Sequence, residues 1–265
     1  MVSSGALASK NYYRNGQQYR QTDVSFADIR RQFGFRAIHI GRWVTQQEQI
    51  KAANLIYDAL MDLATILQVP PQVLSLRNTL SIAFGTGGQP GVQAHYELNR
   101  HMLALAKNAG AGALAHEWFH AFDHYIADKV FKPAKQKFAS HAWLLDSCLN
   151  NHPLNLLLVS VYKQIFLSAD GEKVSHLFSH SAEVDKQLGH VYYALPEELA
   201  ARCFEAFVQD HPIKNQYLVS GTKQTQEAKF GLFPTEQHRA DINQAFSYYF
   251  RQLGRGIFNE NIAIR

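Results

Sequence analysis

The clearest pattern in the chain is a long amphipathic stretch between residues 45 and 68. Apolar residues return there every three or four positions, as they do on the buried face of a helix. Thr45 is followed three residues later by Glu48, which is the arrangement of a helix-starting capping box. Pro70 and Pro71 stand where the helix must stop. The pattern therefore predicts one long helix.

Shorter apolar runs on either side of this helix predict strands. Ala37–Ile40 alternates apolar and polar residues, and Leu80–Phe84 is apolar nearly throughout. Gln93–Leu98 and His101–Ala106, separated by the turn Asn99-Arg100, predict a hairpin. An edge strand such as Gln93–Leu98 would give an extended peptide a place to pair.

The second half of the chain has mainly helical patterns. Besides a short helix at 25–32, helices are expected at 153–167, 173–188, 196–209 and 235–253. We find no internal repeat and no low-complexity linker. The expected architecture is a single α+β domain over residues 23–265, with a small mixed sheet and a mainly helical C-terminal half.

The composition is that of an ordinary globular protein. Apolar residues make up 46% of the 265 residues and charged residues 18%. Cys148 and Cys203 are far apart in the sequence, which favours free thiols in a reducing compartment. The N-terminus lacks the apolar centre of a signal peptide, and no apolar run approaches the roughly 18 residues of a membrane span. We therefore expect a cytoplasmic protein with no membrane partner.

Residues 1–22 are polar and show no periodicity, so we expect a flexible N-terminal arm. Its segment Tyr12–Arg20 (YYRNGQQYR) mixes aromatic and basic residues, a combination that also occurs where proteins bind nucleic acid. The net charge of +4 is mild and lacks the clustered Lys and Arg of a dedicated nucleic-acid-binding protein. A nucleic-acid partner is therefore the second interpretation of this segment.

The strongest chemical signal is the H-E-x-x-H sequence at residues 116–120. On a helix, His116 and His120 lie one turn apart on the same face and can reach a single metal ion. Glu117 lies about 100° round the helix from His116. There it can take a proton from a metal-bound water and pass it to a leaving group. The motif predicts a Zn²⁺ site with a general base beside it.

An amphipathic helix with a solvated polar face would be the other explanation of this motif. Trp118, Phe119 and Phe122 leave little of the helix suited to water. Buried imidazoles need a compensating partner, which a metal would supply, so the metal site is favoured. Asp123, seven residues after His116, is either an outer partner that orients a ligand imidazole or a plain surface carboxylate.

A catalytic zinc ion takes three protein ligands and keeps one position open. A second helix must supply the third ligand, and Pro196–Gln209 offers Glu198 and Glu205 on one face with Arg202 between them. An exposed ladder of ion pairs would give the same spacing. The apolar residues in the rest of this helix favour an inward role for its acidic residues. Glu198, near the helix start, is our candidate ligand, with Arg202 and Glu205 as supporting residues.

These residues also carry a family resemblance. HEWFHAFDHY (116–125) followed by LPEELAARCFEAFV (195–208) resembles the zincin metallopeptidases of the gluzincin type, whose third ligand is a downstream Glu. The pattern is similar to that of the catalytic domain of anthrax lethal factor. Over longer stretches of residues 33–125, and again over residues 195–208, the chain resembles the bacterial CLCA-X family. It is also similar there to the zincin-like domain associated with large polyvalent proteins of phages and mobile elements.

The resemblance implies a zincin-like fold in which the small sheet packs on the H-E-x-x-H helix and Glu117 is the catalytic base. It implies the zinc ligands His116, His120 and Glu198. In lethal-factor-like enzymes a Tyr shortly before the Glu ligand stabilises the oxyanion, and Tyr192 or Tyr193 stands near that place. Two aromatic core residues would be the other explanation of this pair.

The function expected from these features is zinc-dependent hydrolysis of peptide bonds in a peptide or protein substrate. The alternative is a catalytically inactive accessory or binding protein of zincin fold, linked to phage or mobile-element DNA. A metal hydrolase that acts on another type of bond is a third interpretation, because the motif specifies water activation but not the scissile group.

Overall fold

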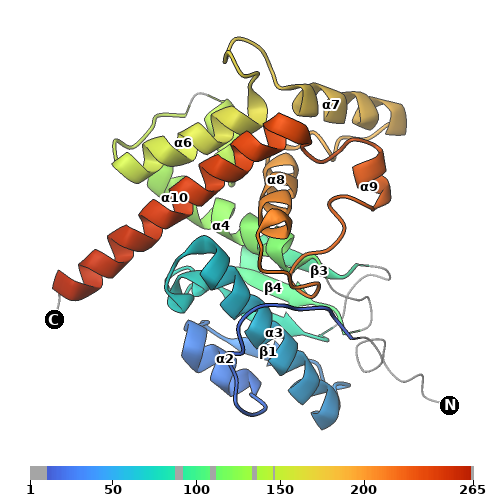
Figure 1. Cartoon of the computed structure of the whole chain (residues 1–265), viewed down its shortest axis with the longest axis vertical. Coiled ribbons are helices and arrows are strands. Elements are labelled where there is room, and N and C mark those ends of the chain that lie inside the picture. Colours follow the sequence, from blue (N-terminus) through green and yellow to red (C-terminus); the bar gives the residue numbers. More distant parts are fainter. Residues whose placement is uncertain (1–10, 87–91, 108–111, 133–135, 146, 264–265) are drawn as a thin grey trace. The chain divides into compact units, whose positions relative to one another are not determined.

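The structure, a computed structural model, describes residues 11–86, 92–107, 112–132, 136–145 and 147–263 (Figure 1). The chain divides into two units. The first comprises Met1–Ala121 and His211–Ser220, and the second comprises Phe122–Asp210 and Gly221–Arg265.

Capping boxes start the two N-terminal helices of the first unit. α2 (Phe26–Phe33) follows Ser25, whose hydroxyl accepts a hydrogen bond from the backbone N–H three residues on. α3 (Gln46–Leu67) follows Thr45, which exchanges hydrogen bonds with Glu48 in the same way. Both helices predicted from the sequence are confirmed.

Among its described residues, the first unit contains a four-stranded sheet in the order β1-β2-β4-β3. Its strands are β1 (Ile38–Ile40), β2 (Ser81–Phe84), β3 (Ala94–Glu97) and β4 (Met102–Leu105). β1 is parallel to β2 and β2 to β4, whereas β3 is antiparallel to β4 and forms one edge. α3 provides part of the long crossover that the parallel pair β1 and β2 requires. The predicted mixed sheet and hairpin are confirmed.

The two central strands lie in the core of the first unit. Every residue of β2 and β4 is buried, which explains their nearly continuous apolar sequences. Two 3₁₀ segments, η1 (Pro71–Ser75) and η2 (Leu98–Arg100), follow α3 and β3. The indole N–H of the fully buried Trp118 donates to the Leu74 carbonyl at 3.0 Å. This bond fixes the start of α4 to η1.

The second unit is helical. α4 (Leu114–Val130) begins in the first unit, and its residues from Phe122 onward belong to the second. The other helices are α5 (Ala139–Leu144), α6 (Pro153–Phe166), α7 (His176–Leu188), α8 (Pro196–Asp210), α9 (Gln226–Lys229) and α10 (Glu236–Ala263).

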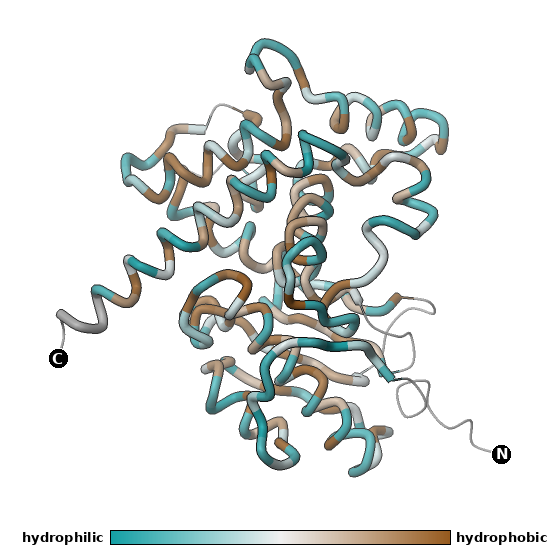
Figure 2. Tube along the Cα trace, viewed as in Figure 1, coloured by the Kyte–Doolittle hydropathy of each residue, from teal (hydrophilic) through white to brown (hydrophobic). Residues whose placement is uncertain are grey.

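The core of the second unit is aromatic. α10 packs against α6 and α8, and Figure 2 shows brown and teal segments alternating along α6 and α10, as in amphipathic helices. The ring of Phe250 lies 5.4 Å from that of Phe122 on α4 and 5.8 Å from that of Phe204 on α8, between centroids. Rings at these distances in tilted arrangements pack favourably.

The mixed sheet and the mainly helical second half confirm the predicted α+β class. In the part of the chain that the structure describes, no helix combines the length and apolar character needed to cross a membrane.

Candidate metal centre

The first turns of α4 bring two imidazoles together. The Nε2 atoms of His116 and His120 lie 2.9 Å apart, and the ring centroids lie 4.6 Å apart with an angle of 75° between the ring planes. His120 is buried and His116 is half-buried. The two rings therefore meet on one face of the helix, as its period requires.

This pair of nitrogens fits a zinc ion. Two nitrogens bound to one zinc ion at about 2.0–2.1 Å in a tetrahedral arrangement are roughly 3.3 Å apart. The observed separation of 2.9 Å is close to that value, so a small rotation of either ring would place both nitrogens on one ion. Neutral imidazole is also among the ligands that zinc prefers.

The edge strand holds the carboxylate of Glu117. Its Oε2 accepts a hydrogen bond from the Tyr96 backbone N–H at 2.8 Å. The Ala106 N–H donates to the Gln93 carbonyl at 2.9 Å, and backbone groups alternate in direction along an antiparallel ladder. The N–H of Tyr96 accordingly points away from β4, on the outer side of β3. Glu117 therefore lies beside the edge at which an extended chain would pair.

Glu198 lies in the first turn of α8. Glu198 belongs to the second unit, whereas His116 and His120 belong to the first. Glu198 is half-buried. Two imidazoles and one carboxylate are a donor set that catalytic zinc sites use.

The charged residues that follow Glu198 on α8 are buried. Arg202 is 3% exposed and Glu205 is 8% exposed. The alternative explanation of their spacing, an exposed ladder of ion pairs, is therefore wrong. The Arg202 guanidinium donates from Nε to the Leu232 carbonyl at 2.9 Å and from Nη2 to the Ser181 hydroxyl at 3.3 Å. Burial lowers the pKa of Arg202 despite the opposing effect of nearby negative groups.

The backbone around the two candidate tyrosines is held from two sides. The Asp185 carboxylate accepts hydrogen bonds from the backbone N–H groups of Tyr192, Tyr193 and Ala194, at distances of 2.8 to 3.0 Å. The Nη2 of Arg202 donates to the Tyr193 carbonyl at 2.6 Å, and the guanidinium carbon lies 5.3 Å from the Tyr193 ring centroid. This short loop therefore has a fixed backbone.

The two tyrosine side chains differ in exposure. Tyr192 is 42% exposed, whereas Tyr193 is half-buried and burial raises its pKa. The rings form a T-shaped pair with centroids 5.1 Å apart. A phenol on a fixed backbone can donate a hydrogen bond, so both tyrosines remain candidates for the oxyanion role.

Asp123 is fully buried and not a surface carboxylate. Its carboxylate accepts hydrogen bonds from the Ser140 backbone N–H at 3.0 Å, the Ser140 hydroxyl at 2.5 Å and the Tyr162 hydroxyl at 2.7 Å. The donors belong to α5 and α6, so this carboxylate fixes α4 to both helices. Buried charges need such partners.

Replacing Tyr162 with phenylalanine is expected to lower the free energy of unfolding by about 1–3 kcal/mol, because a buried carboxylate loses one of its donors. Burial, then the charge of Asp123, raises the pKa of Tyr162 well above its ordinary value, so the hydroxyl stays a donor at neutral pH. Urea denaturation measures the effect. The matched control is Tyr248→Phe, which removes a hydroxyl from a side chain that is 44% exposed. Equal effects of the two variants would contradict this role of Tyr162.

Two features of this region were not predicted from the sequence. The Tyr96 backbone N–H that holds Glu117 has no local signal, because any residue supplies such a group. The second feature, the role of Asp185, does have a local signal in the sequence. Asp185 lies in the last turn of α7, where the helix dipole disfavours a carboxylate, so its presence there points to a specific partner.

Comparison with protein families gives one match. A family described as large polyvalent protein-associated domain 1 matches residues 184–257, from the end of α7 through most of α10. This match supports the predicted likeness to polyvalent protein-associated domains over that part of the chain. Comparisons with curated proteins and with solved structures give no significant match.

Proposed function

We propose that this protein is a zinc-dependent metallopeptidase of the zincin type. The observation that supports this most directly is the geometry of α4. The Nε2 atoms of His116 and His120 lie 2.9 Å apart, and the Glu117 carboxylate is held by the backbone of β3. Glu198 would be the third ligand, which leaves one position for water.

Each residue would have a separate task in peptide hydrolysis. A zinc ion bound by these ligands would supply a Lewis acid that activates water near neutral pH and polarises a carbonyl. Glu117 would take the proton of the attacking water and deliver it to the leaving amine. Tyr192 or Tyr193 would donate a hydrogen bond to the oxygen that gains negative charge.

The edge strand β3 gives the substrate a place to bind. A peptide that extends the sheet at β3 would form backbone hydrogen bonds with it, which supply affinity without a strict sequence requirement. The Tyr96 N–H already donates to Glu117, so the peptide would pair with the other outward-facing backbone groups of β3 and lie beside the base. This arrangement favours an extended peptide or protein segment as the substrate class.

Three further residues would support the ligands. The buried carboxylate of Asp123, on the helix that carries both histidines, would orient a ligand imidazole. Arg202 and Glu205 would fix the charge and orientation around Glu198 on α8. Outer partners of this kind typically change metal affinity 10- to 100-fold when they are removed.

We place this activity in the cytoplasm. Cys148 and Cys203 are free thiols, which suits a reducing compartment. Burial raises the pKa of Cys203 to about 12, so this thiol is a packing residue rather than a nucleophile.

The metal content of protein purified without chelator tests the proposal. About one zinc ion per chain is expected, and Glu198→Ala should lose it. The matched control is Glu197→Ala, the neighbouring half-buried acid whose Oε2 lies 3.6 Å from the Nδ1 of His141. Mass spectrometry of the ion gives the stoichiometry. A protein that takes up no zinc even after incubation with the metal would sink the proposal.

A second candidate function is favoured by the family match at residues 184–257. The protein would then be an inactive accessory component associated with large polyvalent proteins, with DNA as a partner. Two arginines of the basic N-terminal segment are paired inside the molecule: Arg14 with Asp62 and Arg20 with Asp58. A salt-sensitive gel shift with DNA that disappears on deleting residues 1–22 would favour this candidate.

A further inference from the structure

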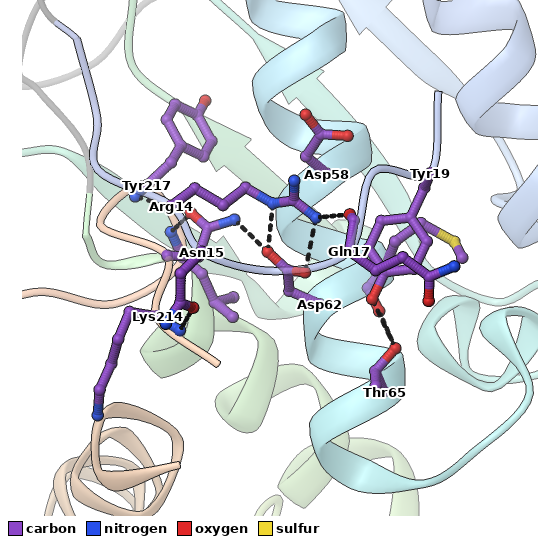
Figure 3. Close-up of polar contacts among 12 residues, drawn as sticks. Arg14, Asn15, Gln17, Tyr19, Asp58, Asp62, Thr65, Lys214 and Tyr217 are labelled. Carbon is purple, nitrogen blue, oxygen red and sulfur yellow. Dashed lines mark hydrogen bonds and ion pairs between the residues drawn. The ribbon is translucent and has the colours of Figure 1, made fainter. Parts of the chain in front are cut away.

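A bidentate ion pair joins the N-terminal segment to α3. The Arg14 Nε lies 2.6 Å from one carboxylate oxygen of Asp62, and Nη2 lies 2.8 Å from the other (Figure 3). Asp62 is fully buried. Burial alone would lower the pKa of Arg14, but the hydrogen bonds and charge of Asp62 outweigh it and raise the pKa. A fork of two charge-assisted hydrogen bonds fixes both position and orientation.

Asp62 also contacts the loop His211–Ser220. The side-chain amide of Asn215 donates to Asp62 Oδ2 at 2.7 Å. The side-chain oxygen of Asn215 in turn accepts hydrogen bonds from the backbone N–H groups of Tyr217 at 3.0 Å and Leu218 at 3.1 Å. Asn215 is buried, so its orientation is set by these partners.

The same loop holds the start of α4. The Leu218 carbonyl accepts from the Ala115 N–H at 3.0 Å, and the Tyr217 carbonyl accepts from the Gly112 N–H at 3.1 Å. Gly112 has a φ of +114°, and a side chain there would lie 2.7 Å from the Cβ of Ser220. The bond from Ala115 satisfies an N–H group in the first turn of α4, which has no partner within the helix itself. The bond from Gly112 fixes the chain just before the helix. Ala115 is the residue directly before His116.

We propose that Arg14 is a positioning residue for the metal-binding helix, acting through Asp62, Asn215 and the loop that holds Ala115. This inference rests on the proposed function, because it gives the N-terminal segment a role in fixing the first zinc ligand. The path is continuous: guanidinium to carboxylate, carboxylate to amide, amide to loop backbone, and loop backbone to the helix start.

A second ion pair on the same helix provides a control. Arg20 donates to both carboxylate oxygens of Asp58, at 2.9 and 2.7 Å, one turn before Asp62 on α3. Among the described residues, the side-chain hydrogen bonds of Asp58 are those with Arg20, and none leads to the loop His211–Ser220. Arg20 therefore anchors the N-terminal segment without a connection to α4.

The experiment compares Arg14→Gln with Arg20→Gln in the full-length protein. The first readout is hydrogen exchange of the peptide that covers residues 113–120, measured by mass spectrometry without metal. The second is zinc affinity in competition with a chelator. Arg14→Gln is expected to speed exchange at the start of α4 and to weaken zinc binding roughly tenfold, whereas Arg20→Gln should change neither.

A second variant perturbs the same path without removing a charge. A Cβ on Gly16 would collide with the Asp62 carboxylate, so Gly16→Ala should displace that carboxylate and reproduce both effects of Arg14→Gln. Arg14→Lys, which keeps the charge but not the fork, should restore zinc affinity only in part.

The outcomes separate the two proposals. Equal exchange at residues 113–120 in the Arg14 and Arg20 variants would overturn the positioning role, and so would equal zinc affinities. If the unmodified protein binds no zinc, the proposed function fails, while the exchange comparison still decides whether Arg14 holds the start of α4.

Discussion

Glu117→Gln is expected to lower peptide hydrolysis by roughly 10²–10⁴-fold, the usual contribution of a general base, while one zinc ion per chain stays bound. Glutamine has the same shape as glutamate, and its side-chain oxygen can still accept the hydrogen bond from the Tyr96 N–H. The contact at the sheet edge would therefore remain, and only the capacity to take a proton would be lost. A combined loss of metal and activity would indicate structural damage instead.

The measurement is hydrolysis of a fluorogenic peptide library, with zinc content determined on the same samples. The matched control is Glu183→Gln on α7, which removes an equal charge from an exposed side chain. This control should keep near-normal activity. Full activity in the Glu117 variant, alongside an active parent protein, would show that another group is the base.

Helix boundaries were predicted well where local signals are strong. The capping box of Thr45 and Glu48 marks the start of α3, and Pro196 is the first residue of α8. The predicted end of the last helix at Leu253 is wrong: Gly254 and Gly256, each of which destabilises a helix by about 1 kcal/mol, lie inside α10. The helix nevertheless continues to Ala263. Local propensity is a weak guide when it conflicts with the rest of a helix.

In the candidate metal centre, too, local relations could be predicted from the sequence, whereas contacts between distant segments could not. The relation between His116 and His120 follows from the helix period alone, so their spacing was enough to place them on one face. The partners of the neighbouring acids could not be predicted. Glu117 bonds to a residue 21 positions away, and Asp123 bonds to one 39 positions away. Contacts between distant segments leave no spacing pattern, so only the fold reveals them.

The N-terminal segment illustrates a pattern with two explanations. Its arginines and tyrosines fit a nucleic-acid-binding arm, and the sequence does not show which groups the arginine side chains contact. In the structure, Arg14 and Arg20 pair with the carboxylates of Asp62 and Asp58, which lie one turn apart on α3. The two arginines thus have acidic partners within the chain.

Arg239 on α10 connects several parts of the second unit through one buried side chain. Its Nε and Nη2 lie 2.6 and 3.0 Å from the two carboxylate oxygens of Asp210, at the end of α8. The Arg239 guanidinium also donates to the Thr222 hydroxyl at 2.7 Å and to the Pro234 carbonyl at 3.2 Å. All these residues lie within the segment 184–257 that matches the polyvalent protein-associated family. The ion pair therefore belongs to the framework of that segment.

Arg239→Met is expected to lower the free energy of unfolding by about 3 kcal/mol at neutral pH, because it leaves a mostly buried carboxylate without its main partner. Lys223→Met removes a cation that is 60% exposed from the same carboxylate, so it should cost less than about 1 kcal/mol. Guanidinium chloride denaturation of the two variants compares these effects. Equal costs would mean that burial adds nothing to the Arg239 pair.

The cost of Arg239→Met should also depend on pH. Burial alone would raise the pKa of the Asp210 carboxyl, but hydrogen bonds from Arg239 and Lys223 hold it well below the ordinary value of 3.8. A folded-state pKa below the unfolded-state pKa means that the carboxylate stabilises the fold above about pH 4, and that this contribution is lost as the pH falls toward the folded-state pKa. The difference between the parent protein and Arg239→Met should therefore shrink in acid. A cost that stays constant down to about pH 3 would show that Arg239 acts through packing of its side chain and not through its charge.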